Sequence, residues 1–147
     1  MGLVAVVAIF ALCGAVARAQ QPAKKVPRIG YLTDASASDP QTVLRLDALR
    51  QRLRNLGYVE GKNINIEYRY ADGKVERLPE LAEEIVRLKI DILVVANDRV
   101  ARAAKKSTAT IPIVMVSAGN PFLSGLIASQ ARPGGNVTGL ANYTAEL

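Results

Sequence analysis

The chain has 147 residues, of which 50% are hydrophobic, and 19 Lys and Arg against 13 Asp and Glu give it a formal net charge of +6. This length and composition suit one globular domain with a buried core and exclude an intrinsically disordered chain. The chain has no histidine and a single cysteine. His-assisted nucleophiles and metal sites built from His or several Cys ligands are therefore excluded, and we predict no metal site.

The first 19 residues are predicted to be a secretory signal peptide. Residues 2–17 are almost wholly apolar, and the Ala-Arg-Ala sequence that ends at Ala19 gives the small-x-small pattern at which such peptides are cut. Cleavage after Ala19 would place the mature protein in the periplasm. An uncleaved membrane anchor is the alternative, although residues 2–17 are slightly short for a bilayer of ~30 Å. Lipidation of Cys13 is disfavoured because the bulky Leu12 precedes it.

The first predicted strand and helix follow a polar lead-in at residues 20–27. Residues 28–33 are mostly apolar and predict a short strand. Asp39 is a suitable N-cap for a helix over residues 40–56, with Pro40 at its first position. Leucines and a valine recur in that helix at spacings of three and four, which predicts one apolar stripe, and Gly57 follows its end.

The next two predicted elements are a half-exposed strand and an amphipathic helix. Residues 63–70 alternate polar and apolar side chains, which is typical of a strand near a sheet edge. Residues 75–89 have acidic residues early and basic residues late, as the helix dipole favours. Pro79 is tolerated there because it lies in the first turn.

Residues 91–98 contain the strand on which the rest of the prediction depends. Its run from Ile92 to Ala96 is continuously apolar, which indicates a strand buried on both faces. We then predict a short helix at 99–106, a strand at 111–116, a helix at 122–131 and a fifth strand at 136–140. This alternation predicts an α/β fold with a parallel open sheet and helices on both faces, over residues 28–140.

Small polar residues gather after three of the predicted strands, where ligands bind in open parallel sheets. Each of the three loops leads into a predicted helix, so backbone N–H groups and helix dipoles converge there. The predicted ligand-binding residues are Thr33, Asp34 and Ser36 after the first strand, Asn97 and Asp98 after the third, and Ser117 and Asn120 after the fourth. The alternative is structural: Asp39, Asp98 and Asn120 only cap helices.

Several other functions are disfavoured by their missing motifs. No G-x-G-x-x-G or P-loop motif occurs at a strand-to-helix junction, so we predict no nucleotide or dinucleotide cofactor. The pair Glu83 and Glu84, with Arg87 one turn later, fits a solvated helix face better than paired catalytic acids. The arginines of residues 40–56 point in several directions round their helix, and aromatic residues are not interleaved with them, so no nucleic-acid partner is predicted.

With these elements placed, the chain resembles the N-terminal half of ABC-transporter substrate-binding proteins with the type I periplasmic-binding fold. Seven runs carry the resemblance and cover nearly all of the mature chain. They are ARAQQP at 17–22, RIGYL at 28–32, LGYVEGKNI at 56–64, IEYR at 66–69, RLPELA at 77–82, TIPIV at 110–114 and ARPGGNVTG at 131–139.

The resemblance implies a carrier that clamps a small molecule, in this branch often an amino acid, between two lobes. It delivers that molecule to an ABC permease in the membrane and catalyses no reaction. The three polar loops would form one wall of the cleft, and residues 141–147 would begin the hinge to a second lobe. The family commonly has small residues where Asn97, Asp98 and Arg99 stand here, so the ligand preference stays open.

A single lobe would offer one side of the clamp only. We therefore expect weak ligand binding and self-association through the uncovered hinge face. Two other functions stay open at this point. An exported α/β enzyme would have only Asp34 and Asp98 as candidate acids or bases in its loops. A regulatory effector-binding domain shares the lobe fold, but a DNA-binding helix pair would replace the signal peptide.

Overall fold

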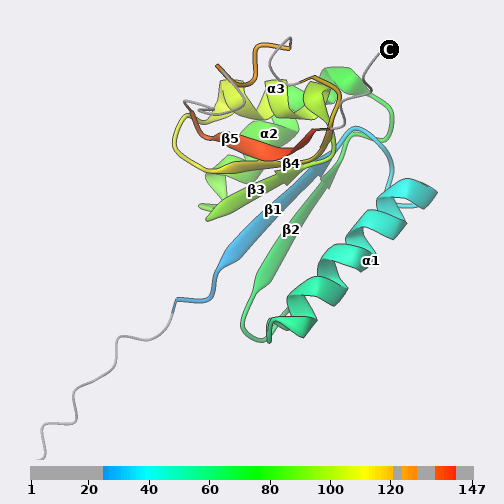
Figure 1. The fold of residues 1–147 in the computed structure, drawn as a ribbon, viewed down its shortest axis with the longest axis vertical. Helices are drawn as coiled ribbons and strands as arrows, with labels where there is room; N and C mark the ends of the chain where they lie inside the picture. Colours follow the sequence, from blue (N-terminus) through cyan, green and yellow to red (C-terminus); the bar gives the residue numbers. More distant parts are fainter. Residues whose placement is uncertain (1–24, 121–123, 129–134, 142–147) are drawn as a thin grey trace, which may run out of the picture.

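The computed structural model describes residues 25–120, 124–128 and 135–141 (Figure 1). Five parallel strands form one sheet in the order β2-β1-β3-β4-β5. The strands are β1 (Arg28–Thr33), β2 (Asn65–Tyr70), β3 (Ile92–Val95), β4 (Ile113–Ala118) and β5 (Val137–Ala141). The helices are α1 (Pro40–Asn55), α2 (Leu78–Arg87) and α3 (Asp98–Ser107), and the short 3-10 helix η1 (Val75–Arg77) leads into α2.

The sheet has helices on both faces, as predicted. Helix α1 covers one face, and α2 and α3 lie side by side on the other (Figure 1). Each strand contributes side chains to both faces of the sheet, because successive side chains point to opposite sides. Tyr31 and Val94 belong to the core on the α1 side, whereas their neighbours Leu32 and Val95 belong to the core under α2 and α3.

Strand β3 lies at the centre of the sheet, hydrogen-bonded to β1 on one side and β4 on the other. Leu93 and Val95 have no exposed surface, and Ala96 just after the strand is 1% exposed. Val94, on the opposite face, is 8% exposed, so the strand is buried on both faces from Leu93 to Val95, as predicted, whereas Ile92 at its start is 38% exposed. Strand β2, in which polar and apolar side chains alternate, lies at the edge of the sheet. This confirms the prediction of an edge strand from residues 63–70.

The helix predicted for residues 122–131 is wrong over the part that the structure describes. Residues 124–128 form turns and bends, and Gly125 has a φ of 70°, in the left-handed region. Lys105 of α3 donates hydrogen bonds to the carbonyls of Gly125 (3.2 Å) and Leu126 (3.1 Å), which satisfies acceptors that a helix would have paired internally. Leu126 is 2% exposed and packs in the core, so tertiary contacts decide this segment. The rest of the predicted helix lies outside the described residues.

Strand β4 runs two residues later than predicted, which places Ser117 in the strand and not in the loop after it. Pro112 stands outside the strand, and its carbonyl accepts a hydrogen bond from the amide of Leu93 (2.9 Å). Leu93 then pairs with Ile113, and this register carries β4 on to Ala118. Proline has no N–H to donate to a neighbouring strand, so the regular ladder begins at the residue after it.

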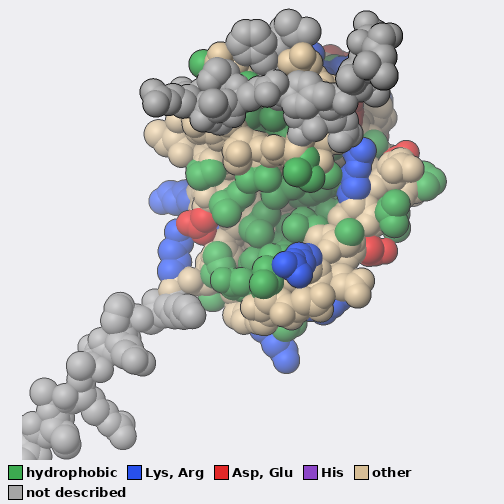
Figure 2. Space-filling model, viewed as in Figure 1, with side chains coloured by type: hydrophobic (Ala, Val, Ile, Leu, Met, Phe, Trp, Pro, Cys, Tyr) green, Lys and Arg blue, Asp and Glu red, His purple; other side chains and the backbone are tan. Residues whose placement is uncertain are grey.

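On the α1 side, the sheet has an apolar groove between α1 and the strands β4 and β5. Its volume is about 600 Å³. Figure 2 shows hydrophobic side chains gathered in a hollow on this face. The groove is lined mainly by aliphatic residues, among them Leu49, Val94, Val114, Val116 and Leu140, and also by Tyr31 and Arg45. The hydroxyl of Tyr31 is buried and has no hydrogen-bond partner among the described residues.

Candidate ligand-binding site

A polar hollow of about 330 Å³ lies at the carboxyl edge of the sheet, where β1, β3 and β4 end. Its lining comes from the three loops that the sequence indicated and from the first turns of α3. The lining residues are Asp34, Asn97, Asp98, Arg99, Arg102, Ser117 and Gly119. Four of the seven predicted site residues are thus brought together, because neighbouring parallel strands end at the same edge.

Asn97 joins the loop after β3 to the loop after β1. Its side-chain N–H donates to Asp34 Oδ1 (2.9 Å). Its side-chain oxygen accepts from the amide of Val100 (3.2 Å), which makes Asn97 the N-cap of α3. One side chain therefore starts the helix and also fixes the carboxylate of Asp34 at the rim of the hollow.

Asp98 joins the loop after β3 to the loop after β4. Its Oδ1 accepts a hydrogen bond from the amide of Gly119 (3.2 Å). It is also the first residue of α3, where the helix dipole favours a negative charge. Hydrogen bonds of Asn97 and Asp98 consequently join the three loops to one another.

An ion pair joins Arg99 to the same carboxylate of Asp34. Arg99 Nη1 lies 3.8 Å from Asp34 Oδ2, and the arginine side chain is 58% exposed against 22% for the aspartate. At this distance and exposure the pair contributes little to stability, because water screens it. Its effect is to direct the guanidinium of Arg99 toward the rim of the hollow.

Three of the predicted site residues do not line the hollow. Thr33 is 1% exposed, its hydroxyl accepts from the amide of Ala35 (3.2 Å), and its carbonyl accepts from Ala71 (3.0 Å). The hydroxyl of Ser36 pairs with that of Ser38 (3.2 Å). Asn120 lies just beyond the rim, where its carbonyl accepts from the amide of Ser124 (3.0 Å). Thr33 and Ser36 thus shape the loop after β1, and Asn120 shapes the turn after β4.

The prediction omitted three lining residues, Arg99, Arg102 and Gly119. A usable signal existed for one of them: Arg102 is four residues after Asp98, so the two share a face of the predicted helix. Gly119 contributes its backbone N–H, which a search for polar side chains does not find. Among the described residues, no group of three or more His, Cys, Asp or Glu is placed to hold a metal ion.

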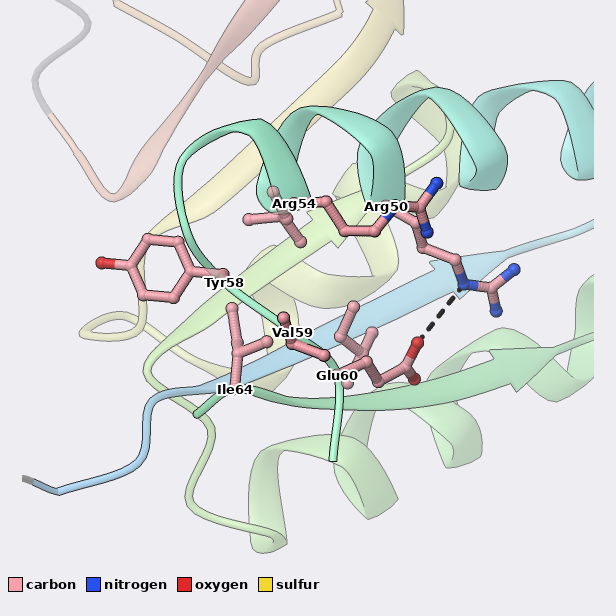
Figure 3. Close-up of a pocket in the computed structure, with 8 residues that line it drawn as sticks. Arg50, Arg54, Tyr58, Val59, Glu60 and Ile64 are labelled. Carbon is pink, nitrogen blue, oxygen red and sulfur yellow. Dashed lines mark ion pairs between the residues drawn. The ribbon is translucent and has the colours of Figure 1, made fainter. Parts of the chain in front are cut away.

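A second, smaller hollow of about 180 Å³ lies beside the C-terminal half of α1, near the start of β2 (Figure 3). Arg50 and Glu60 point toward one another there, with Arg50 Nε 3.4 Å from Glu60 Oε2. The hydroxyl of Tyr68 donates to Glu60 Oε1 (2.9 Å) and accepts from Arg50 Nε (3.2 Å). The three groups satisfy one another, which is typical of a structural cluster that fixes the loop between α1 and β2.

This cluster raises the pKa of Tyr68 to about 12. Burial contributes most, because it disfavours the charged phenolate, and the hydrogen bond to Glu60 also favours the protonated form. The guanidinium of Arg50 opposes the shift. Burial also raises the pKa of Tyr31 and of Tyr70 on the same face of the sheet.

The model of the ABC transporter substrate-binding protein family matches residues 36–146. The chain belongs to this family. Among curated relatives, the chain is similar to a tyrosine-binding protein of Clostridioides difficile (strain R20291), with 34% identity over 91 residues. That match covers 62% of the chain and 26% of the relative.

Several solved structures share the fold of this chain. One is the ABC domain of a Streptococcus pneumoniae protein in complex with L-Trp, with a TM-score of 0.74 and 23% identity over 81% of the chain and 39% of that structure. Another is a conserved domain protein of Vibrio cholerae, with a TM-score of 0.71 and 30% identity over 82% of the chain and 40% of that structure. The chain thus spans less than half the length of these proteins.

The link between Asn97 and Asp34 can be tested with the substitution Asn97→Asp. The variant keeps an acceptor for the amide of Val100 but faces Asp34 with a second carboxylate, and mutual repulsion raises the pKa of the folded pair above its unfolded value. Stability relative to the native chain is then retained below the unfolded pKa and lost as the pH rises. We expect a loss of about 1–3 kcal/mol in unfolding free energy at pH 7 and a smaller loss at pH 4.

Urea denaturation at the two pH values measures this difference. The control is Asn97→Ser, which keeps a cap without adding a charge and should lose similar stability at both pH values. Equal losses for Asn97→Asp at pH 4 and pH 7 would contradict the assigned hydrogen bond to Asp34.

The pKa of Tyr68 gives a second prediction. A phenol whose folded pKa is about 12 and whose unfolded pKa is about 10 contributes stability below pH 10 that is lost as the pH rises toward 12. The variant Tyr68→Phe should therefore lose less stability than the native chain between pH 10 and 12. The stability of this variant should still fall somewhat as the pH rises, because burial also raises the pKa of Tyr31 and Tyr70.

Denaturant midpoints at several alkaline pH values test this expectation. Tyr58→Phe is the matched control, because Tyr58 is 40% exposed and takes no part in the hydrogen bonds of Arg50 and Glu60. Identical pH profiles for the native chain and Tyr68→Phe would show that the phenol is not held by this cluster.

Proposed function

We propose that this chain forms one lobe of an extracytoplasmic carrier that binds a small solute and delivers it to an ABC permease. The observation that carries the proposal is the convergence of three strand-end loops on one polar hollow. Hydrogen bonds of Asn97 and Asp98 join these loops to one another. Pre-formed polar sites at this edge of a parallel sheet are typical of ligand binding.

An amino acid is the proposed solute class. The support is the 34% identity to a relative that is named a tyrosine-binding protein. The hollow offers the carboxylates of Asp34 and Asp98 for an ammonium group, and the guanidinium of Arg102 and the N-terminal end of α3 for a carboxylate. A zwitterion therefore has a partner for each of its charges.

We propose binding without catalysis. The family and the curated relative are binding proteins. Asp34 and Asp98 are the two acidic groups that line the hollow, and each already accepts a hydrogen bond that fixes a loop. These bonds suit a positioning role better than proton transfer.

The proposed domain organisation follows the predicted pattern. Residues 1–19 are a signal peptide that is removed after Ala19 in export to the periplasm, residues 20–27 are a lead-in, residues 28–140 are the binding lobe, and residues 141–147 begin a hinge to a second lobe. The cleavage site and the hinge lie outside the described residues, apart from position 141. Among the helices that the structure describes, none is long and apolar enough to cross a membrane.

Solute binding can be tested on residues 20–147 by titrating the ¹⁵N-labelled chain with each of the twenty amino acids. We expect at least one amino acid to shift the amide signals of residues 97–99 and 117–119, with a dissociation constant on the order of millimolar, because one wall of a two-lobed cleft makes only part of the contacts. The variant Asp34→Asn should weaken that binding.

Three results would count against these proposals. No shifts with any amino acid at about 20 mM, well above a millimolar dissociation constant, would overturn amino-acid binding by this lobe. Micromolar affinity of the isolated chain would overturn the expectation that a single lobe binds weakly. Loss of a measured turnover in Asp34→Asn or Asp98→Asn would favour an enzyme.

We also propose that copies of this chain associate through their uncovered apolar surface. Leu140 of β5 is 71% exposed and lines the apolar groove under α1. Contact with another apolar surface would remove this area from water.

Sedimentation velocity over a range of concentrations tests the association. The variant Leu140→Glu should shift the chain toward monomer. The matched control is Leu56→Glu, because Leu56 is 60% exposed but lies at the end of α1 outside the groove. A native chain that stays monomeric at all concentrations, or equal effects of the two substitutions, would contradict the proposal.

A further inference from the structure

The charges that line the polar hollow are unequally compensated. Both oxygens of Asp34 are engaged, Oδ1 by the amide of Asn97 (2.9 Å) and Oδ2 by the guanidinium of Arg99 (3.8 Å). Asp98 Oδ1 accepts from the amide of Gly119, and its position at the start of α3 also stabilises its charge. Each carboxylate thus already has a partner in the protein, and its remaining lone pairs stay available to the ammonium group of a solute.

Arg102 differs from these residues. It is exposed, and it forms no ion pair or hydrogen bond with any other residue that the structure describes. It stands one helical turn after Asp98 and Arg99 in α3, so all three side chains border the same hollow. Arg102 is therefore the uncompensated positive charge of this site.

The rest of the lining does not suit an aromatic side chain. Apart from the two arginines, the side chains that line the hollow are short and polar or absent: Asp34, Asn97, Asp98, Ser117 and Gly119. Among the described residues, the large apolar surface lies instead in the groove under α1. Aromatic ligands are usually held by apolar or aromatic walls, and this wall has neither.

We propose that Arg102 determines specificity in this site by favouring solutes with a net negative charge, such as acidic amino acids, over neutral aromatic ones. A guanidinium binds a carboxylate through charge-assisted hydrogen bonds, and here the partner group would come from the solute. The inference rests on the proposed solute-binding function and concerns which class of solute this lobe prefers.

The test compares L-glutamate with L-glutamine, which has nearly the same shape but lacks the side-chain charge, and with L-tyrosine. Each is titrated into ¹⁵N-labelled residues 20–147 at low ionic strength, and the dissociation constant is taken from the amide signals of residues 97–99 and 117–119. We expect L-glutamate to bind roughly three- to tenfold more tightly than L-glutamine, as for a partly exposed charge pair. The preference should shrink as salt is added.

Three variants separate charge recognition from a change of structure. Arg102→Gln should abolish the preference for L-glutamate, whereas Arg102→Lys, which keeps the charge, should retain part of it. The control Arg52→Gln changes an exposed arginine of α1 that does not line the hollow, and it should leave the preference unchanged.

The possible failures are distinguishable. Equal binding of L-glutamate and L-glutamine, tighter binding of L-tyrosine, or an unchanged preference in Arg102→Gln would overturn the role of Arg102 while leaving solute binding in place. The absence of amide shifts with every amino acid would overturn the proposed function itself, and the specificity with it.

Discussion

The burial of β3 between two parallel neighbours is the constraint on which the rest of this structure depends. A strand with apolar side chains on both faces needs helices above and below it, and α1 on one side and α2 with α3 on the other provide most of that cover. Parallel neighbours in turn place the ends of β1, β3 and β4 at one edge. The polar hollow forms at this edge because neighbouring parallel strands have their carboxyl ends on the same side of the sheet.

Hydrogen bonds between loops make that edge a defined site. Asn97 links the loop after β3 to Asp34 and caps α3 with the same side chain, and Asp98 links it to the amide of Gly119. A site held in this way loses little conformational freedom when a solute binds, because the protein has already ordered it. This arrangement supports the carrier function that we propose for the lobe.

The two faces of the sheet are not equally complete. Under α2 and α3 the core is closed, whereas α1 leaves a groove of about 600 Å³ over β4 and β5. The groove and the polar hollow differ in chemistry: the first is lined mainly by aliphatic side chains, and the second by charged and small polar ones. The structure therefore separates a surface suited to protein contact from a surface suited to a small polar solute.

The sequence by itself determined the order of the five strands and of the helices α1, α2 and α3, the parallel α/β fold and four of the hollow's lining residues, because periodicity, caps and the apolar run at 92–96 are local signals. Only the tertiary structure decided that residues 124–128 form turns. Lys105 donates hydrogen bonds to the carbonyls of Gly125 and Leu126, and the side chain of Leu126 is buried in the core. The tertiary structure also buried Thr33 and placed the amide of Gly119 at the hollow. Which polar groups meet, and which are buried, depends on strand register and on contacts between residues far apart in the chain. Those contacts leave no pattern of spacing in a single sequence.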